Sequence, residues 1–214
     1  LPKEMGCGCG MTCWRRLRAW QDAGIWEKLH RVLLDRLGAA NAIDWSRAAL
    51  DAAAVPAKGG EGTGPNPTDR GRAGAKRHVL TDANGIPLAL CLTPANTHDS
   101  VPFAELIDAV PPVRQCRGRP RRRPAKLHAD KAYDLPRCRR DLAKRGIAGR
   151  IARRGIESSQ RLGRHRWVVE RTLAWFSRFR RLTVRYERRS DIFEAFHHLA
   201  AALICWRFVQ RWFC

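Results

Sequence analysis

The sequence predicts an α/β fold in which a mixed β-sheet is flanked by helices. Apolar runs of strand length gather early in the chain, and strands and helices then alternate toward the C-terminus. Hydrophobic residues make up 44% of the 214 residues, so the chain has enough apolar surface for one core of ordinary domain size.

Three strands are expected first. One runs through residues 45–55, and a polar, glycine-rich stretch over 58–76 is interpreted as a loop. β-Branched, apolar runs at 77–81 and 86–92 then flank an Asn-Gly step, which favours the tight reversal of a β-hairpin.

The rest of the chain predicts alternating helices and strands. A helix capped by Asp99 or Ser100 continues to Val110, where two prolines stop it. The later elements are a strand at 125–129, a helix at 136–144, a strand at 147–152 and two helices at 164–182 and 191–212. Three strands followed by helix, strand, helix, strand and helix match the order of a ribonuclease H-like α/β fold with a mixed sheet.

Two short helices over residues 12–37 precede this domain, with Thr12 as the expected cap and Gly24 as the break between them. The chain is therefore divided into a short helical N-terminal appendage, residues 1–40, and the ribonuclease H-like domain, residues 44–214. Two helices bury little surface by themselves. They either pack on the following domain or read DNA independently, and the sequence leaves both alternatives open.

The charge of the chain indicates a polyanionic partner. Lysine and arginine number 41 against 20 aspartates and glutamates, a formal net charge of +21. Such an excess is unfavourable in a compact protein unless a polyanion offsets it. Because the apolar content excludes a disordered basic tail, we expect a folded protein that binds nucleic acid.

The most basic segment, residues 114–123, contains six arginines and no acid. Its Arg117-Gly118-Arg119-Pro120 core resembles the segments with which AT-hook proteins grip the minor groove. A plain phosphate-binding or surface loop is the favoured alternative, since four such residues recur by chance in any arginine-rich loop.

Neither a membrane span nor a secretion signal is expected. The longest apolar run near the C-terminus, residues 199–206, falls short of the roughly 18 to 20 apolar residues that span a bilayer. We therefore expect a cytoplasmic protein associated with the nucleoid.

Eight cysteines are scattered along the chain, and only Cys7, Cys9 and Cys13 cluster. This cluster has the ligand type of a zinc site but lacks the second pair that such sites need. Reduced, unpaired thiols are therefore favoured over zinc.

Two aspartates occupy positions that suit a metal site. Asp51 lies within the first apolar strand and Asp130 closes the strand at 125–129. A carboxylate within a strand is costly unless it is paired or bound to a metal, and carboxylates are the ligands that Mg²⁺ prefers. For each aspartate taken alone, a capping or salt-bridged role remains equally open. Asp134, four residues later, is interpreted as a turn or cap residue.

Glu170 is the third candidate. With about 100° of rotation per residue, the apolar residues of the helix fall on one broad face, while Arg166, Glu170, Ser177 and Arg181 fall on the opposite, polar side. Arg166 precedes Glu170 by four residues, so it can pair with the glutamate or with a phosphate. Alone, an ordinary surface ion pair would be the preferred interpretation.

Longer motifs decide between these alternatives by resemblance. Residues 126–134 (KLHADKAYD) and 164–176 (RHRWVVERTLAWF) resemble the second-aspartate and glutamate blocks of DDE transposases of the insertion-sequence-five family. Further segments are also similar to that family, at 69–71, 74–78, 95–100 and 153–157. The resemblance covers nearly the entire chain.

The resemblance implies a DNA transposase. Asp51, Asp130 and Glu170 would be the catalytic residues and would hold two Mg²⁺ ions, with Mn²⁺ as a substitute. The enzyme would cut double-stranded DNA at the element ends and transfer the strand to target DNA, as a homodimer or larger assembly. The residues expected to contact DNA are Arg166, Lys131, Arg117, Arg119, Arg178 and Arg181.

The sequence departs from the family pattern in two respects. Gly163 and Ser177 stand where the family often has tyrosine and lysine, and Arg178 or Arg181 is the expected substitute for the lysine. The helical N-terminal segment of the family is largely missing, so residues 1–40 are interpreted as its remnant and the chain as N-terminally truncated.

Two other functions remain open. One is a non-catalytic basic DNA-binding protein from a truncated or decayed element. The other is a cellular ribonuclease H-like nuclease, which would cut DNA without strand transfer.

Overall fold

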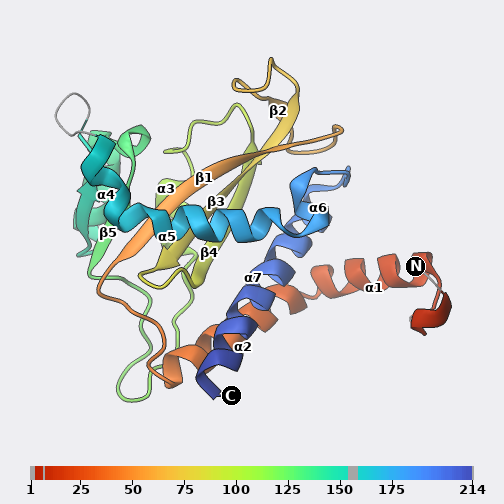
Figure 1. Cartoon of the computed structure of the whole chain (residues 1–214), viewed down its shortest axis with the longest axis horizontal. Helices are drawn as coiled ribbons and strands as arrows, with labels where there is room; N and C mark the ends of the chain where they lie inside the picture. The colour runs from red at the N-terminus through yellow and green to blue at the C-terminus, as the bar shows by residue number, and fades with distance from the viewer. Residues whose placement is uncertain (1–2, 7, 154–158, 214) are drawn as a thin grey trace.

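The structure is a computed structural model that describes residues 3–6, 8–153 and 159–213 (Figure 1). Within these residues a six-stranded mixed sheet forms the centre of the molecule. The strands are β1 (Ala48–Pro56), β2 (Gly64–Pro65), β3 (Ala73–Asp82), β4 (Pro87–Pro94), β5 (Lys126–Ala129) and β6 (Ala148–Ile151). Their order is β2-β3-β1-β5-β6, and β4 also pairs with β3.

The sheet is antiparallel on one side and parallel on the other. β3 pairs antiparallel with β1 and β4, whereas β5 pairs parallel with both β1 and β6. The order of elements and the mixed sheet confirm the predicted ribonuclease H-like architecture.

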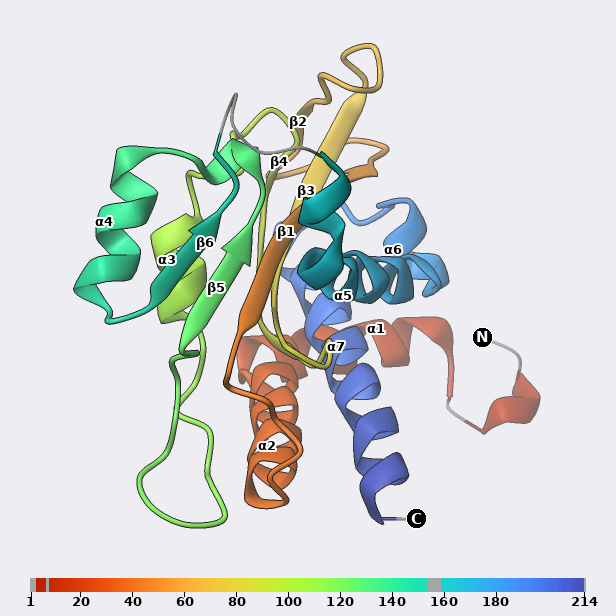
Figure 2. The same cartoon turned by 60° about the vertical axis from the view of Figure 1, so that its left-hand side comes forward.

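Helices cover both faces of the sheet (Figures 1 and 2). They are α1 (Gly10–Asp22), α2 (Ile25–Ala39), α3 (Phe103–Asp108), α4 (Pro136–Lys144), α5 (Ser159–Ser177), α6 (Arg180–Thr183) and α7 (Ser190–Phe213), with short 3₁₀ turns η1 (Lys3–Met5) and η2 (Lys131–Tyr133). α5 lies across β1 and β3 and, with α6 and α7, covers one face, here called the α5 face. α3 and α4 cover the other.

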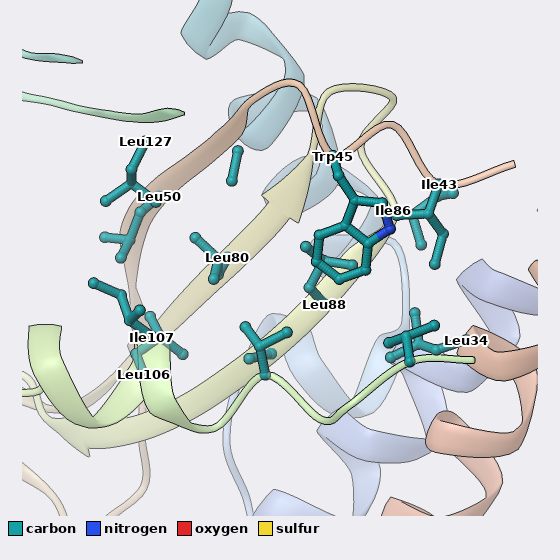
Figure 3. Close-up of a cluster of buried hydrophobic side chains, with 14 of the residues drawn as sticks. Leu34, Ile43, Trp45, Leu50, Leu80, Ile86, Leu88, Leu106, Ile107 and Leu127 are labelled. Carbon is teal, nitrogen blue, oxygen red and sulfur yellow. The ribbon is translucent and has the colours of Figure 1, made fainter. Parts of the chain in front are cut away.

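Strand alternation divides the core into two clusters. Leu50 and Leu80 point toward α3 and α4, where Trp45, Leu106 and Leu127 join them (Figure 3). Val55 and Val79 belong to the second cluster, together with Leu173, Phe176, Leu182 and Phe193 of the covering helices. Because successive side chains of a strand point to opposite faces, Asp51 is directed to the α5 face.

Several predicted elements match the structure closely, and others differ at their ends. The helix at 136–144 is α4 residue for residue. The expected loop over 58–76 instead contains β2 and the first residues of β3, whose pairing with the end of β1 extends the strand. The first strand begins at Ala48 and not at residue 45.

Three predictions about helix ends were wrong. Thr12 does not cap α1, because the helix already begins at Gly10 after Cys9. α3 begins only at Phe103, since Asp99 pairs with Lys76 and Ser100 bonds to His98. The helix predicted at 164–182 is interrupted after Ser177, where extended backbone at Phe179 separates α5 from α6.

The N-terminal helices differ from each other. α2 buries Leu33, Leu34 and Leu37 in the first core cluster and packs against α7. α1 has no buried residue. Of the two alternatives for this segment, α2 therefore adopts the packed one.

α7 is the one helix in the described part of the chain that is long and apolar enough, by length and composition, to cross a membrane. Core helices of soluble proteins pass the same test, so this is weak evidence. Here 56% of the apolar window is buried inside the protein, and the helix contributes side chains to both core clusters.

Gly38 of α2 gives a first testable prediction. A Cβ at this position would lie 2.2 Å from the carbonyl oxygen of Arg114 and 2.7 Å from Val113 Cγ1. Gly38→Ala should therefore lower the free energy of unfolding by about 2 kcal/mol, despite alanine's higher helix propensity. Urea unfolding measures this, with Val32→Ala on the exposed face of α2 as the control. An unchanged midpoint for Gly38→Ala would contradict the close approach of α2 to this loop.

Candidate active site

Asp51 is a largely buried carboxylate on the α5 face of the sheet. Its Oδ1 accepts a hydrogen bond from its neighbour's amide, Ala52 N, at 2.8 Å. Burial raises the pKa of the carboxyl to about 6, while Arg166 opposes the shift and the charge of Asp130 adds to it. A carboxylate in this position gains free energy from any cation that pairs with it.

Asp130 lies beside Asp51 because of the register between β1 and β5. The paired residues Ala48 and Leu127 are 79 positions apart, as are Ala49 and His128, and so are Asp51 and Asp130. Strand pairing ends at Ala49 and His128, and just beyond it the charge of Asp130 helps to raise the pKa of Asp51, so the two carboxylates lie near each other. Asp130 Oδ1 accepts from Ala132 N at 2.8 Å and so caps the turn η2.

Arg166 of α5 connects the strand to the helix. Its Nη2 donates to Asp51 Oδ2 at 3.3 Å, a contact between residues 115 positions apart. The same nitrogen lies 3.7 Å from Glu170 Oε1. Only 16% of the Arg166 side chain is exposed, and its Nε has no hydrogen-bond partner. The Arg166–Glu170 pair is therefore more than an ordinary surface ion pair, since it is attached to a buried carboxylate.

Glu170 lies at the edge of the site, with 56% of its side chain exposed. Helical geometry placed it correctly: Val168, Val169, Leu173 and Phe176 are buried, whereas Glu170 and Ser177 are exposed. Arg181, expected on the same polar side of one helix, belongs instead to α6.

The three carboxylates are the type of ligand that a divalent cation prefers, but their positions suit such a cation only in part. Asp51 and Asp130 supply carboxylate oxygens from neighbouring strands, which suits Mg²⁺. Within the described residues, however, no group of three or more Asp, Glu, His or Cys side chains is close enough to hold a metal ion. Arg166 lies between Asp51 and Glu170, so metal binding by all three would require this arginine to move.

Two features of the surroundings were not predicted. Tyr133 is fully buried next to the site, its hydroxyl has no hydrogen-bond partner, and burial raises its pKa well above the usual value. His128 of β5 lies against His165 of α5, with ring centroids 4.9 Å apart, and burial lowers the pKa of His128 to about 4. The sequence signal for the position of His128 is strand alternation, because it sets His128 and Asp130 on the same face of β5.

The other predicted site residues are spread more widely. Arg117 and Arg119 are exposed in the loop that the Val113–Arg121 bridge closes, Arg178 is exposed after α5, and Lys131 is half-buried in η2. Arg181 is held by Glu187 at 2.5 Å and lies over the ring of Phe196. Asp134 pairs with Arg139 at 2.6 Å, in agreement with its predicted structural role.

The remaining predictions concern residues at the limits of the description. Cys7 and residues 154–157, part of one family-like segment, lie outside the described residues. Cys9 is a free thiol, as are Cys91, Cys116, Cys138 and Cys205.

A comparison with protein families decides the identity of the chain. Residues 44–205 match the family described as the transposase DDE domain. The chain belongs to this family. The match includes all three candidate carboxylates and begins where the predicted main domain begins.

Curated relatives of this DDE transposase domain come from insertion sequences. The chain is 54% identical over 149 residues to a putative transposase for insertion sequence element IS402 of Burkholderia cepacia, covering 70% of the chain and 71% of the relative. It is 57% identical over 68 residues to an uncharacterized 16.2 kDa protein of the same element in that organism, covering 31% of the chain and 46% of the relative.

Among solved structures, a Mos1 transposase paired-end complex with the left transposon end matches with a TM-score of 0.31 and 11% identity. The match covers 87% of the chain and 61% of the Mos1 chain.

Proposed function

We propose that this domain catalyses divalent-metal-dependent DNA strand cleavage and strand transfer at the ends of an insertion sequence. Asp51, Asp130 and Glu170 would be the catalytic residues and the ligands of two Mg²⁺ ions, with Mn²⁺ as a substitute. The observation that supports this most is the nearness of Asp51 and Asp130 just beyond the paired residues of β1 and β5, together with the Arg166 link from Asp51 to Glu170.

The residues would divide the work as follows. Bound Mg²⁺ supplies activation of a water or a 3′-hydroxyl and stabilises charge on the phosphate. Asp51 would be ionised at neutral pH, since burial raises its pKa only to about 6, and it would bind from β1 while Asp130 binds from the end of β5. Glu170 would complete the set from α5. Arg166, once it leaves the two carboxylates, would donate to a phosphate oxygen near the reacting bond.

Double-stranded DNA, both element ends and target, is the proposed substrate. The net charge of +21 would offset backbone phosphates, and Lys131, Arg117, Arg119 and Arg178 are proposed contacts. Arg181 would contact DNA only if it exchanged its partner Glu187 for a phosphate. Joining two DNA ends calls for two active sites, so we propose a homodimer or larger assembly that works at the nucleoid.

The alternative function is DNA binding without catalysis. Two observations favour it: Arg166 pairs with both Asp51 and Glu170, and no metal-holding group of three acidic, histidine or cysteine side chains occurs within the described residues. Binding would then be indifferent to Mg²⁺.

The test is a plasmid-nicking assay with Asp130→Asn. Loss of one metal ligand should reduce Mg²⁺-dependent nicking by about a thousandfold or more, because metal ions supply several kcal/mol of transition-state stabilisation. DNA affinity, set by arginines, should stay within about twofold. The matched control is Asp134→Asn, four residues away in the Arg139 ion pair.

Two outcomes would contradict the proposal. Nicking by Asp130→Asn at the rate of the unmodified protein would remove the metal mechanism and leave the binding function. Cleavage without joining, when a pre-cut element end is supplied, would identify a nuclease and not a transposase.

A further inference from the structure

We propose that a second DNA-binding site, distinct from the carboxylates, lies between α5, the β3–β4 turn and the C-terminal part of α7, and that it binds unpaired bases of single-stranded DNA. It consists of two adjoining hollows of about 510 and 150 Å³ that share Trp175, Phe208 and Arg211. We call their combined lining the Trp groove. α5 and α7 meet at this side of the sheet in Figure 1.

The lining of the Trp groove is aromatic and cationic. Five arginines line it and, among the described residues, no acid does: Arg47, Arg171, Arg178, Arg207 and Arg211. Four aromatic side chains alternate with them: Trp167, Trp175, Phe208 and Trp212. Cations with interleaved aromatic rings are the combination by which proteins hold single-stranded nucleic acid, through phosphate pairing and base stacking.

Exposed rings make stacking possible. Trp167 is 49% exposed and Trp212 is 56% exposed, although both are large apolar side chains at a concave site. The Arg171 guanidinium carbon lies 4.6 Å from the Trp167 ring centroid and 4.7 Å from that of Trp175, so a cation fills the space between two rings. Arg171 Nη2 donates to Asn84 O at 2.6 Å, while its buried Nε has no partner.

The groove fits unpaired DNA better than a duplex. In a double helix each base hides its faces in the stack, so exposed tryptophan faces reach only bases that are unpaired or flipped out. Arg171 follows Glu170 directly and points about 100° away from it around α5, whereas Trp167 precedes Glu170 by three residues and lies next to it on the exposed surface of the helix. The groove would therefore hold a separated strand alongside DNA at the carboxylates. This inference rests on the proposed function in one respect, which is that the ligand is DNA.

The experiment measures binding of a labelled 12-nucleotide oligothymidine and of a 12-base-pair duplex in EDTA. Trp167→Ala should weaken single-strand binding by roughly tenfold, as stacking on one base contributes about that much, and duplex binding less than twofold. Trp167→Phe should keep single-strand binding within about threefold, because phenylalanine retains a stacking face. Arg211→Ala should weaken single-strand binding by removing a phosphate contact at the same groove.

Two controls match these variants. Trp14→Ala removes a 41% exposed tryptophan that also lies under an arginine, Arg18, but outside the groove. Arg15→Ala removes one exposed charge from the same helix, α1. Both should leave the preference for single strands unchanged, and thermal melting should show that every variant is folded.

Several results would overturn the inference. Equal losses on single strands and duplex would make the groove a general phosphate surface, and no loss would leave it without a role in binding. A change of mass in size-exclusion chromatography, with single-strand binding intact, would make the occupant a second copy of the chain. EDTA removes divalent metal, so the binding assay does not depend on metal chemistry. Either experiment, the Asp130→Asn nicking assay or the single-strand binding assay, can therefore fail while the other succeeds.

Discussion

Asp51→Asn should abolish Mg²⁺-dependent DNA nicking and, at neutral pH, raise the melting temperature of the protein. Loss of nicking, about a thousandfold or more, is expected because asparagine is a weak ligand for Mg²⁺. The gain in stability is expected because burial opposes the negative charge of Asp51, and asparagine carries none.

The pH dependence of stability shows why Asp51→Asn should stabilise the protein at neutral pH. The pKa of Asp51 is raised from 3.8 to about 6 on folding, so the folded state binds the proton more tightly than the unfolded state. The contribution of the group to stability is therefore fully present below pH 3.8 and is lost as the pH rises through about 6. The upper bound on this loss is about 3 kcal/mol.

Differential scanning fluorimetry from pH 4 to 8 measures the effect. The melting temperatures of the parent and Asp51→Asn should be close near pH 4, diverge up to about pH 6 and then stay apart. Adding Mg²⁺ at pH 7.5 should raise the melting temperature of the parent more than that of the variant, since cation binding stabilises the folded state.

Asp108→Asn is the control, because the hydrogen bond from Arg145 outweighs burial and lowers the pKa of Asp108. Its variant should not gain stability at neutral pH. A parent as stable as Asp51→Asn across the whole range would show that Arg166 neutralises the buried charge of Asp51 completely.

Arg185→Ala should destabilise the fold more than the loss of any exposed arginine. Arg185 is 2% exposed and joins three parts of the chain. Its Nε donates to Glu187 O at 2.9 Å, its Nη2 donates to Glu61 O, and its guanidinium lies 5.0 Å from the Phe193 ring centroid.

The expected loss in the free energy of unfolding is about 3 kcal/mol, because removing the buried guanidinium leaves the carbonyls of Glu187 and Glu61 without these donors. For a domain of this size that lowers the melting temperature by roughly 6 to 12 °C. Thermal denaturation measures it, with Arg188→Ala, three residues away and exposed, as the control. A melting temperature within about 1 °C of the parent would mean that water replaces the guanidinium at these carbonyls.

The sequence by itself determined the order of elements and much of the candidate site. Apolar alternation and the Asn-Gly step predicted β1, β3 and β4, because strand periodicity and turn geometry are local properties. Helical spacing correctly set Glu170 on the exposed side of α5, and the family-like motifs named the family that the comparison confirmed.

Only the tertiary structure decided which of these parts meet. The parallel pairing of β1 with β5 brings Asp51 near Asp130, and the packing of α5 on the sheet brings Arg166 to Asp51 across 115 positions. The Trp groove, likewise, exists only where α5 and α7 converge. Such contacts depend on strand pairing and side-chain packing between distant segments, and local periodicity carries no information about either.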